Sequence, residues 1–329
     1  MSRFRALPLL AAGALCATAG LAGPSALAQG SPVGGAGSQY FLNDQFTGTA
    51  NHEFFYGEPR DNVYFGDWNG DGIDTPLIRR GNTFYVRNAN VTGGADAVFA
   101  YGDPGDTVLV GDWDGDGVDT LAVRRGGVYH VKNSISSGRA DAVIAYGDPG
   151  DTVLVGDWDG DGVDTLAVRR GGVYHVKNSI SSGVADAVFA YGDPGDAVIV
   201  GDWDGNKTDT LGVRRGNVYH LRNSTTSGVA DVVFAYGNPG DAVFAGDWNA
   251  DGTDTLGVRR APAPAVATPA PVSKPAPAPS APAKPRNVNC SDFRTQAEAQ
   301  AWFNRYYPYY GDVAGLDRDH DGKACEALP

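Results

Sequence analysis

The stretch Gly111-Asp112-Trp113-Asp114-Gly115-Asp116-Gly117-Val118-Asp119-Thr120 decides the fold because it recurs along the chain. Its Gly-Asp-Trp start stands at Gly66, Gly111, Gly156, Gly201 and Gly246, a constant step of 45 residues. A fixed period of this length is typical of repeat proteins, in which each unit is one supersecondary element. The units 106–150 and 151–195 differ at two positions only, Arg139/Val184 and Ile144/Phe189. We therefore expect every unit to have the same structural role.

Each unit contains four short strand patterns. In the unit 106–150, residues 107–110 are apolar throughout, as expected of a strand covered on both faces. Residues 120–124 and 128–132 alternate in polarity and are joined by a Gly-Gly turn, and residues 141–146 precede a Gly-Asp-Pro-Gly turn. Four strands in about 45 residues match one blade of a β-propeller. Because one such sheet cannot bury both faces, the units must stack on one another.

The ends of the repeat region predict a closed ring. Residues 39–59 match the second half of a unit, with these pairs in alignment: Tyr40 and Tyr85, Asn43 and Asn88, Tyr56 and Tyr101, Pro59 and Pro104. The last motif, at Gly246, is followed only by the first half of a unit, which ends at Arg260. Joined, the two halves make one blade and leave no free sheet edge. We predict an all-β, five-bladed propeller over residues 39–260, with four complete blades and one shared between the ends.

The segments that flank the repeats differ in composition from them. Residues 1–28 have two arginines, an apolar run and Ala26-Leu27-Ala28 before the expected cut, which indicates a secretory signal peptide rather than a membrane anchor. Residues 29–38 predict a flexible leader. Residues 261–286 hold nine prolines and predict an extended Pro/Ala linker. Residues 287–329 form a second, small domain.

The charge and cysteine content restrict the setting of the protein. The formal net charge is −13, which disfavours nucleic acid and anionic membrane as partners. No apolar run after the signal peptide is long enough to span a bilayer. After signal cleavage two cysteines remain, Cys290 and Cys325, and an even pair in a secreted chain predicts one disulfide. We expect a secreted monomer, associated with the cell wall.

The repeated loop has the spacing of a calcium site. Acids at positions one, three and five, with glycine at six, can surround a hard cation with oxygen ligands. The alternative is an Asp/Gly turn that only connects strands. The predicted ligands of four loops, position eight included, are Asp67, Asn69, Asp71, Asp74, Asp112, Asp114, Asp116, Asp119, Asp157, Asp159, Asp161, Asp164, Asp247, Asn249, Asp251 and Asp254. The remaining loop has Lys207 at the glycine position, so we expect weak or no binding by Asp202, Asp204, Asn206 and Asp209.

The repeats resemble the FG-GAP/VCBS-type calcium-loop repeats of integrin-like propellers over residues 39–260. The closing acid stands at position eight here, whereas that family has it at position nine, where this chain has threonine, as at Thr75 and Thr120. The resemblance implies a calcium ion that stabilises each blade and a propeller that binds a ligand.

The last domain has the most specific motif of the chain. Asp317-x-Asp319-x-Asp321-Gly322-x-x-Cys325-Glu326 resembles the core of the Excalibur domain, an extracellular calcium-binding module. The resemblance implies four calcium ligands: Asp317, Asp319, Asp321 and Glu326. About 43 residues are too few for a self-sufficient core, so the disulfide should contribute about 3 to 4 kcal/mol to stability. Thr295-x-x-Glu298 has the form of a capping box before a helix over residues 297–306.

Three other residue types recur in the repeats. The tryptophans at 68, 113, 158, 203 and 248 are expected to pack between blades rather than to bind sugars. His130, His175 and His220 occupy the position of Tyr40 and Tyr85, which argues against a metal or acid–base role. Arginine pairs end the second strand of each unit, at 79–80, 124–125, 169–170, 214–215 and 259–260. We expect them to pair with aspartates, the alternative being a ring that receives an anionic polymer.

These observations predict a non-enzymatic, calcium-binding protein of the bacterial envelope type. Its propeller would bind an extracellular glycan or protein, with a cell-wall polymer among the candidates. Two alternatives remain open. A five-bladed glycoside hydrolase would need two carboxylates in distinct roles at one site, and no acid confined to one blade stands out. The other alternative is a structural spacer protein of the cell wall.

Overall fold

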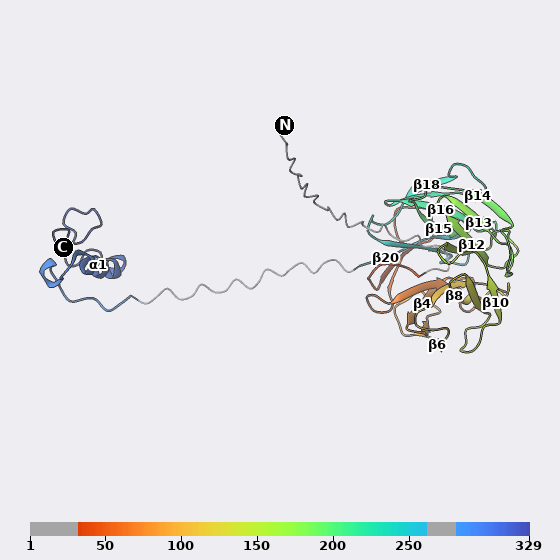
Figure 1. Ribbon diagram of the computed structural model, residues 1–329, viewed down its shortest axis with the longest axis horizontal. Coiled ribbons are helices and arrows are strands. Elements are labelled where there is room, and N and C mark those ends of the chain that lie inside the picture. Colours follow the sequence, from red (N-terminus) through yellow and green to blue (C-terminus); the bar gives the residue numbers. More distant parts are fainter. Residues whose placement is uncertain (1–31, 262–280) are drawn as a thin grey trace, which may run out of the picture. The chain divides into compact units, whose positions relative to one another are not determined.

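The computed structural model describes residues 32–261 and 281–329, which form two compact units. The predicted signal peptide lies outside the described residues, and so does most of the predicted Pro/Ala linker. Within residues 32–261, all regular structure is β: five antiparallel sheets of four strands each (Figure 1). The prediction of a five-bladed propeller with a shared closing blade is confirmed.

Each of the four complete blades follows the chain from its innermost to its outermost strand, and the closing blade joins the last two strands to the first two. Blade 1 consists of β3 (Asn62–Gly66), β4 (Thr75–Arg80), β5 (Thr83–Val86) and β6 (Ala97–Ala100). Blade 2 consists of β7 (Thr107–Gly111), β8 (Thr120–Arg125), β9 (Val128–Lys132) and β10 (Ala142–Ala145). Blade 3 consists of β11 (Thr152–Gly156), β12 (Thr165–Arg170), β13 (Val173–Val176) and β14 (Ala187–Ala190). Blade 4 consists of β15 (Ala197–Gly201), β16 (Thr210–Arg215), β17 (Val218–Leu221) and β18 (Val232–Ala235). The closing blade consists of β19 (Ala242–Gly246), β20 (Thr255–Arg260), β1 (Gln39–Asn43) and β2 (His52–Phe55).

The innermost strands form the inner wall of the ring. β3, β7, β11, β15 and β19 each contact the next, and β19 contacts β3. Four of the five residues of each are buried, as the apolar runs predict, whereas the outermost strands are largely exposed. Burial therefore falls from the inner to the outer strand of each blade.

The hydrophobic core lies between the blades and consists of five clusters. The cluster between blades 3 and 4, for example, joins Trp158 and Tyr174 of one blade to Val198 and Val213 of the next. Because each sheet is covered by its neighbours on both sides, no blade is stable on its own. Burial of about 25 cal/mol per Å² of apolar surface at these interfaces is the main stabilising contribution.

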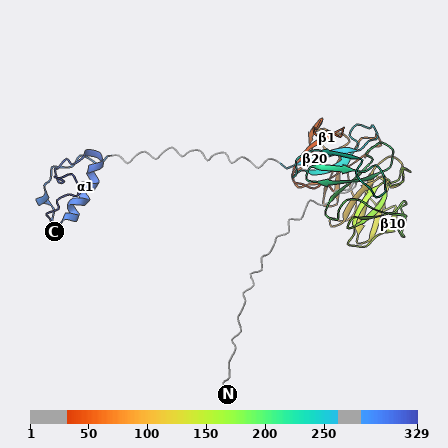
Figure 2. The ribbon, with the colours of Figure 1, turned by 90° about the horizontal axis from the view of Figure 1, so that it is seen from above.

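The closing blade joins the two ends of the repeat region by backbone pairing. β1 pairs antiparallel with β20, from Gln39 opposite Arg260 to Asn43 opposite Leu256, and Figure 2 shows the two strands side by side. The register corrects one detail of the sequence alignment. Phe41, not Tyr40, takes the place of Tyr85, because Phe41 lies opposite Val258 as Tyr85 lies opposite Ile78. The physical reason is that the loop from β1 to β2 is one residue shorter than the loop from β5 to β6.

The described part of the predicted flexible leader is packed against the propeller. Val33 is buried and forms a bridge with Val63 of β3. The buried guanidinium of Arg259 donates hydrogen bonds to the backbone carbonyls of Gly37 (2.6 Å) and Val33 (3.2 Å). Val33 and Gly37 are thus held against the propeller, and the flexibility expected of residues 29–38 stays a prediction. These carbonyls satisfy a buried cation that would otherwise lack acceptors.

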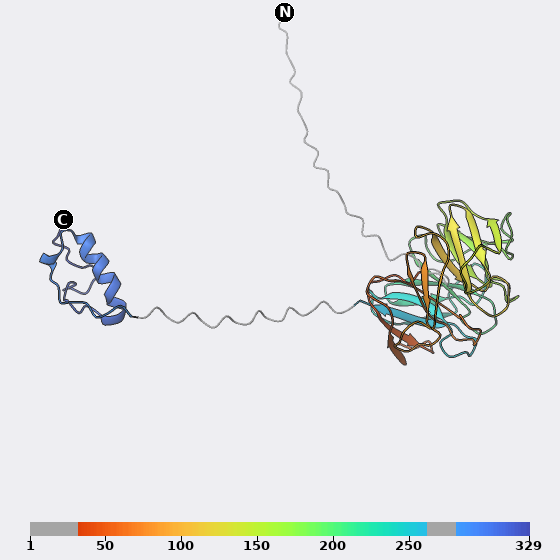
Figure 3. The same cartoon turned by 90° about the horizontal axis from the view of Figure 1, so that it is seen from below.

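The unit 281–329 contains a short 3-10 helix, Cys290–Asp292, and one α-helix, α1 (Gln296–Tyr310), drawn in blue in Figure 3. The Thr295 side chain accepts a hydrogen bond from the N–H of Glu298 and caps α1. The helix runs four residues further than predicted, through Pro308, because a proline in the last turn removes only one helical hydrogen bond. The predicted Cys290–Cys325 disulfide is present, beside a small core that includes Phe303 and Leu316.

Of the helices in the two described units, none has the length and apolar character that a bilayer crossing requires.

Candidate calcium loops

The loop of the C-terminal unit brings three predicted ligands together. Carboxylate oxygens of Asp317, Asp319 and Asp321 lie within 4.8 Å of one another. Asp317 is buried, and its two oxygens accept the N–H groups of Asp321 (3.1 Å) and Gly322 (2.9 Å). Gly322 has φ +86°, the left-handed conformation that makes the sharp turn. Three acids held around one point by their own loop can bind a divalent cation through oxygen.

Glu326, the fourth predicted ligand, lies at the edge of this cluster. Its Oε1 accepts a hydrogen bond from the ammonium of Lys323 (3.3 Å), which also donates to Asp321 Oδ2 (3.0 Å). The Lys323 ammonium holds the pKa of Asp321 below its ordinary value. A cation that recruits both carboxylates must therefore displace the Lys323 ammonium. The lysine was not singled out from the sequence, although its position between two acids is visible there.

Helix α1 supports the C-terminal loop through a residue that the sequence reasoning missed. The side-chain amide of Gln300 donates to the carbonyl of Gly322 (3.0 Å) and accepts the N–H of Ala324 (2.8 Å). Gln300 thus fixes both sides of the turn after the acids. The disulfide anchors the next residue, Cys325.

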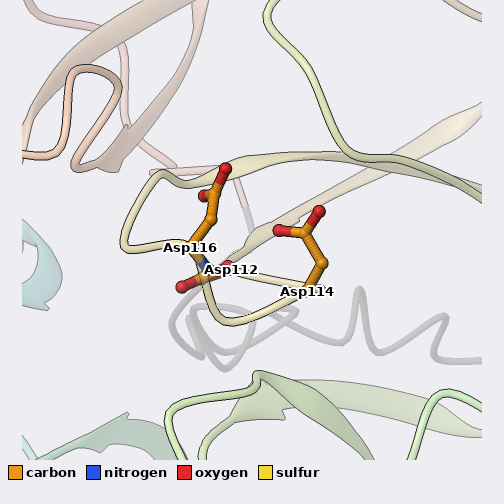
Figure 4. Close-up of side chains that lie close together, drawn as sticks. All are labelled: Asp112, Asp114 and Asp116. Atoms are coloured by element: carbon orange, nitrogen blue, oxygen red, sulfur yellow. Dashed lines mark hydrogen bonds between the residues drawn. The ribbon is translucent and has the colours of Figure 1, made fainter.

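Two propeller loops gather their acids in the same way. Oxygens of Asp112, Asp114 and Asp116 lie within 4.8 Å of one another, and so do those of Asp157, Asp159 and Asp161 (Figure 4 shows the first set). The Asp112 carboxylate accepts the N–H groups of Gly115 (2.8 Å) and Gly117 (2.8 Å). Burial raises the pKa of Asp112 despite these bonds. The third and fifth acids are exposed at the loop surface and could take up a cation.

The other three loops differ at the third, fifth or sixth position. In the loop that begins at Asp67, the side-chain amide of Asn69 donates to Asp71 Oδ2 (2.9 Å), and Asn249 bonds Asp251 likewise (3.1 Å). These amides can offer their oxygen to a cation after rotation of the side chain. In the loop from Asp202 to Asp209, Lys207 keeps the left-handed turn with φ +71°. Weaker binding by this loop stays a prediction.

The acids at position eight have a different place from the one predicted. Asp119 Oδ2 accepts the backbone N–H of Asp67 in the preceding blade (2.8 Å), and the N–H of Asp119 donates to the Asp67 carbonyl (2.7 Å). The same reciprocal pair occurs at every blade interface, with Asp164, Asp209, Asp254 and Asp74 in the place of Asp119. We call these five residues the interblade aspartates. They join neighbouring blades, so their assignment as ligands of their own loops does not fit this placement.

Burial has a large effect on the interblade aspartates. It raises the pKa of Asp119 and of Asp254 to about 7, and it raises that of Asp74, Asp164 and Asp209 well above the ordinary value. The negative charge of neighbouring members adds to the effect, for example that of Asp119 on Asp164. A neutral carboxyl group is therefore favoured at this level of the ring.

The other recurring residues have structural contacts. The five propeller tryptophans are buried between blades, as expected. The first arginine of each pair donates to backbone carbonyls of the turn that leads to the next blade, as Arg124 does to Asp151 (2.9 Å). The second arginine pairs with aspartates of the turn at the preceding interface, as Arg125 does with Asp106 (2.6 Å). The expected Arg–Asp pairing is thus present, and its partners belong to the Gly-Asp-Pro-Gly-Asp type turns rather than to the calcium loops.

Comparison with known proteins identifies the C-terminal unit. Residues 288–326 match the family model of the Excalibur calcium-binding domain. A curated relative, an uncharacterized protein of Pasteurella multocida (strain Pm70), is 50% identical over 46 residues, which is 14% of this chain and 59% of that protein. The chain thus spans about three fifths of that relative's length.

Among solved structures, two crystal structures of BBS1N in complex with ARL6DN resemble the chain weakly. The mercury-soaked one has a TM-score of 0.32 and 14% identity, with 53% of each chain covered. The lead-soaked one has a TM-score of 0.30 and 12% identity, with 53% of this chain and 56% of the other covered.

Proposed function

We propose that this chain is a secreted, non-enzymatic calcium-binding protein whose propeller binds a glycan or a protein at the bacterial envelope. The observation that carries the calcium part is the cluster of Asp317, Asp319 and Asp321 inside a matched Excalibur calcium-binding domain. Extracellular calcium modules bind at about 10⁻⁴ to 10⁻³ M, where the ion is abundant outside cells. The domain type therefore supports an extracellular setting.

The propeller loops extend the same chemistry to the repeats. Two of them hold three carboxylates within 4.8 Å, and the proposal assigns them the blade-stabilising calcium of FG-GAP/VCBS-type repeats. Calcium there would fix the loops that leave the inner strands. A propeller stabilised in this way offers a rigid surface for a ligand, which is the common use of closed β rings.

The calcium part can be tested by calorimetric titration of the full chain. Asp319 and Asp114 are exposed and have no hydrogen-bonded protein partner among the described residues, so their replacement should leave the fold intact. We expect Asp319→Ala to remove the tail site, and Asp114→Ala with Asp159→Ala to remove two propeller sites, because alanine leaves no oxygen ligand. Glu298→Gln is the matched control, because it removes one charge and keeps an oxygen for the Arg294 N–H. Unchanged calcium stoichiometry in the variants would contradict the assignment.

Direct assays distinguish the proposed ligand binding from the two alternatives, the glycoside hydrolase and the structural spacer. Pull-down with cell-wall preparations and a glycan array should retain the full chain. Release of reducing sugar from a polysaccharide panel would replace the proposal by the glycoside hydrolase, which needs paired carboxylates. Failure to retain any glycan or protein would leave the spacer role.

A further inference from the structure

A pocket recurs at the same place of four blade interfaces. The four pockets have volumes of 350, 510, 380 and 250 Å³, and we call them the interblade pockets. Each is lined by a tyrosine that follows the outermost strand of one blade and by the second and third strands of the next. The tyrosines are Tyr56, Tyr101, Tyr146 and Tyr236. Ligand pockets typically have about 300 to 1,000 Å³, so three of the four volumes lie in this range and the fourth, 250 Å³, lies just below it. Pockets of this size suit one unit of a polymer.

The wall of each interblade pocket is built by the same hydrogen bond. The Tyr101 hydroxyl donates to the backbone carbonyl of His130 in the next blade (2.9 Å), and Tyr146 bonds His175 likewise (2.8 Å). The equivalent bonds are Tyr56 to Tyr85 and Tyr236 to Phe41. The backbone carbonyl accepts the tyrosine hydroxyl, and the side-chain ring of that same accepting residue lines the pocket. That ring belongs to Tyr85, His130, His175 or Phe41.

A half-exposed guanidinium supplies donors to each pocket. Arg125 uses Nε and Nη2 for Asp106 and Asp103, and no acceptor within the described residues bonds its Nη1. Arg80, Arg170 and Arg260 use the same two nitrogens for their aspartates. The partner carboxylate is buried, as at Asp106, which holds the guanidinium in one orientation. Two N–H groups of Nη1 therefore remain for a ligand at each pocket.

Acceptors and apolar contacts complete each pocket. The residue after the Tyr-Gly step lines the pocket and carries a side-chain oxygen acceptor; it is Glu58, Asp103, Asp148 or Asn238. An aliphatic side chain, Ile78, Val123, Val168 or Val258, lies in each wall. A donor, an acceptor, a planar ring and an aliphatic contact therefore occur together four times.

This combination fits a saccharide unit. Each sugar hydroxyl both donates and accepts a hydrogen bond, so a fixed guanidinium beside an oxygen acceptor can bind neighbouring hydroxyls. The C–H face of a sugar ring is apolar and packs on a planar ring, as aromatic side chains do at binding sites. The arginine charge is balanced by one or two carboxylates at the pocket, and the chain has a formal net charge of −13. Uncharged sugars are favoured over anionic ones.

We propose that the interblade pockets are subsites for the units of an uncharged, repeating polysaccharide, an inference that rests on the proposed ligand-binding function. Several weak subsites on one rigid ring bind a repeating polymer far more tightly than they bind its monomer, because the later contacts form at high effective concentration. A protein with repeated pockets thus suits a ligand with repeated sugar units. The ring residues His130 and His175 are the clearest test positions, since their side chains make no hydrogen bond within the described residues.

The experiment uses the full chain and neutral oligosaccharides of glucose, galactose, mannose and N-acetylglucosamine. Saturation-transfer NMR finds the sugar that binds, and calorimetry gives its affinity and stoichiometry. We expect the His130→Ala, His175→Ala double variant to lose two subsites and to bind the polymer with an affinity about tenfold lower. Val128→Ala with Val173→Ala is the control, because these residues share the strands β9 and β13 and line no interblade pocket. Thermal unfolding checks that all variants fold.

Each outcome decides the inference. Binding of a neutral sugar that the histidine variant loses and the control keeps supports it. Sugar binding that is unchanged in the histidine variant overturns the pockets as subsites and leaves the proposed function standing. Preference for uronic acid oligomers overturns the uncharged class. Absence of any sugar binding overturns the inference, and capture of a protein ligand in the cell-wall pull-down then decides whether the proposed function survives.

Discussion

Asp119 Oδ2 accepts the backbone N–H of Asp67 at 2.8 Å, across the interface between blades 1 and 2. The two residues lie 52 positions apart and belong to two successive copies of the same loop. Because five such pairs surround the ring, the candidate calcium loops are linked to one another through the interblade aspartates. Each of these hydrogen bonds is a direct contact between neighbouring loops.

The first prediction concerns this hydrogen bond. Asp119→Ala leaves the part-buried N–H of Asp67 without its acceptor and should destabilise the propeller by about 1 to 3 kcal/mol. Asp119→Asn keeps an acceptor oxygen and removes a buried charge, so it should unfold at higher urea than Asp119→Ala. Urea unfolding followed by tryptophan fluorescence measures both variants. The control is Asp114→Asn, which changes an exposed acid of the same loop. In chelator, its urea midpoint should equal that of the unchanged chain. Equal midpoints for Asp119→Ala and Asp119→Asn would contradict the assigned role.

The second prediction is a pH dependence with an unusual sign. Burial raises the folded-state pKa of Asp119 and Asp254 to about 7, from a reference value of 3.8. Between these two values the folded chain binds more protons than the unfolded chain, so stability falls as pH rises. In chelator, the free energy of unfolding should therefore increase from pH 8 to pH 5. Below the ordinary carboxyl range, Asp106 and similar acids with lowered pKa are protonated and stability declines again. Loss of stability from pH 7 to pH 5 would count against buried, proton-binding aspartates.

The third prediction concerns the Cys290–Cys325 disulfide, which closes 35 residues. Its removal in a Cys290→Ala, Cys325→Ala variant should destabilise the C-terminal unit by about 3 to 4 kcal/mol through the gain in entropy of the unfolded chain. Cys325 directly precedes Glu326, so calcium affinity of the tail should fall as well. Hydrogen exchange of the α1 amides reports the unit without interference from the propeller. The propeller amides are the internal control, and unchanged exchange in α1 would show that the small core suffices.

The fourth prediction rebuilds the loop that departs from the others. Asn206→Asp with Lys207→Gly restores the acids and the glycine, and it relieves a left-handed residue that costs about 1 kcal/mol. We expect one more calcium ion bound per chain in equilibrium dialysis. The mirror variant, Asp161→Asn with Gly162→Lys in the loop of blade 3, should bind one ion fewer. If both variants match the unchanged chain, the propeller loops are turns without calcium.

Much of this architecture could be predicted because the sequence motifs recur at a fixed interval. The step of 45 residues gives the blades, and the half units at residues 39–59 and 246–260 give the shared blade. The shift of Phe41 into the place of Tyr85 could not be predicted, because one residue is missing from a loop and the flanking sequence hides it. The role of Asp119 was missed for another reason. Its partner is the backbone of a residue in another repeat, and side-chain spacing says nothing about backbone partners.

In the C-terminal loop, too, the motif residues could be predicted from the sequence, whereas the residues that support them were missed. Asp317, Asp319 and Asp321 were assigned from a motif that resembles the Excalibur core, and the structure gathers them. Gln300 acts through a tertiary contact from a helix, which spacing does not show. Lys323 contacts acids two and three residues away, a local pairing that the sequence reasoning missed. The contacts of Val33 and Gly37 likewise involve Arg259, which is far away in sequence.

The pairing of β1 with β20 also determines when this ring can form. On the ribosome, Gln39 is made early and Arg260 after all the repeats, so the first strand waits with an unpaired edge until the last blade exists. Blades 2 and 3 are almost identical in sequence, and their second strands, β8 and β12, are equivalent to β20. Pairing of β1 with one of them would close the ring too early and leave a blade outside it.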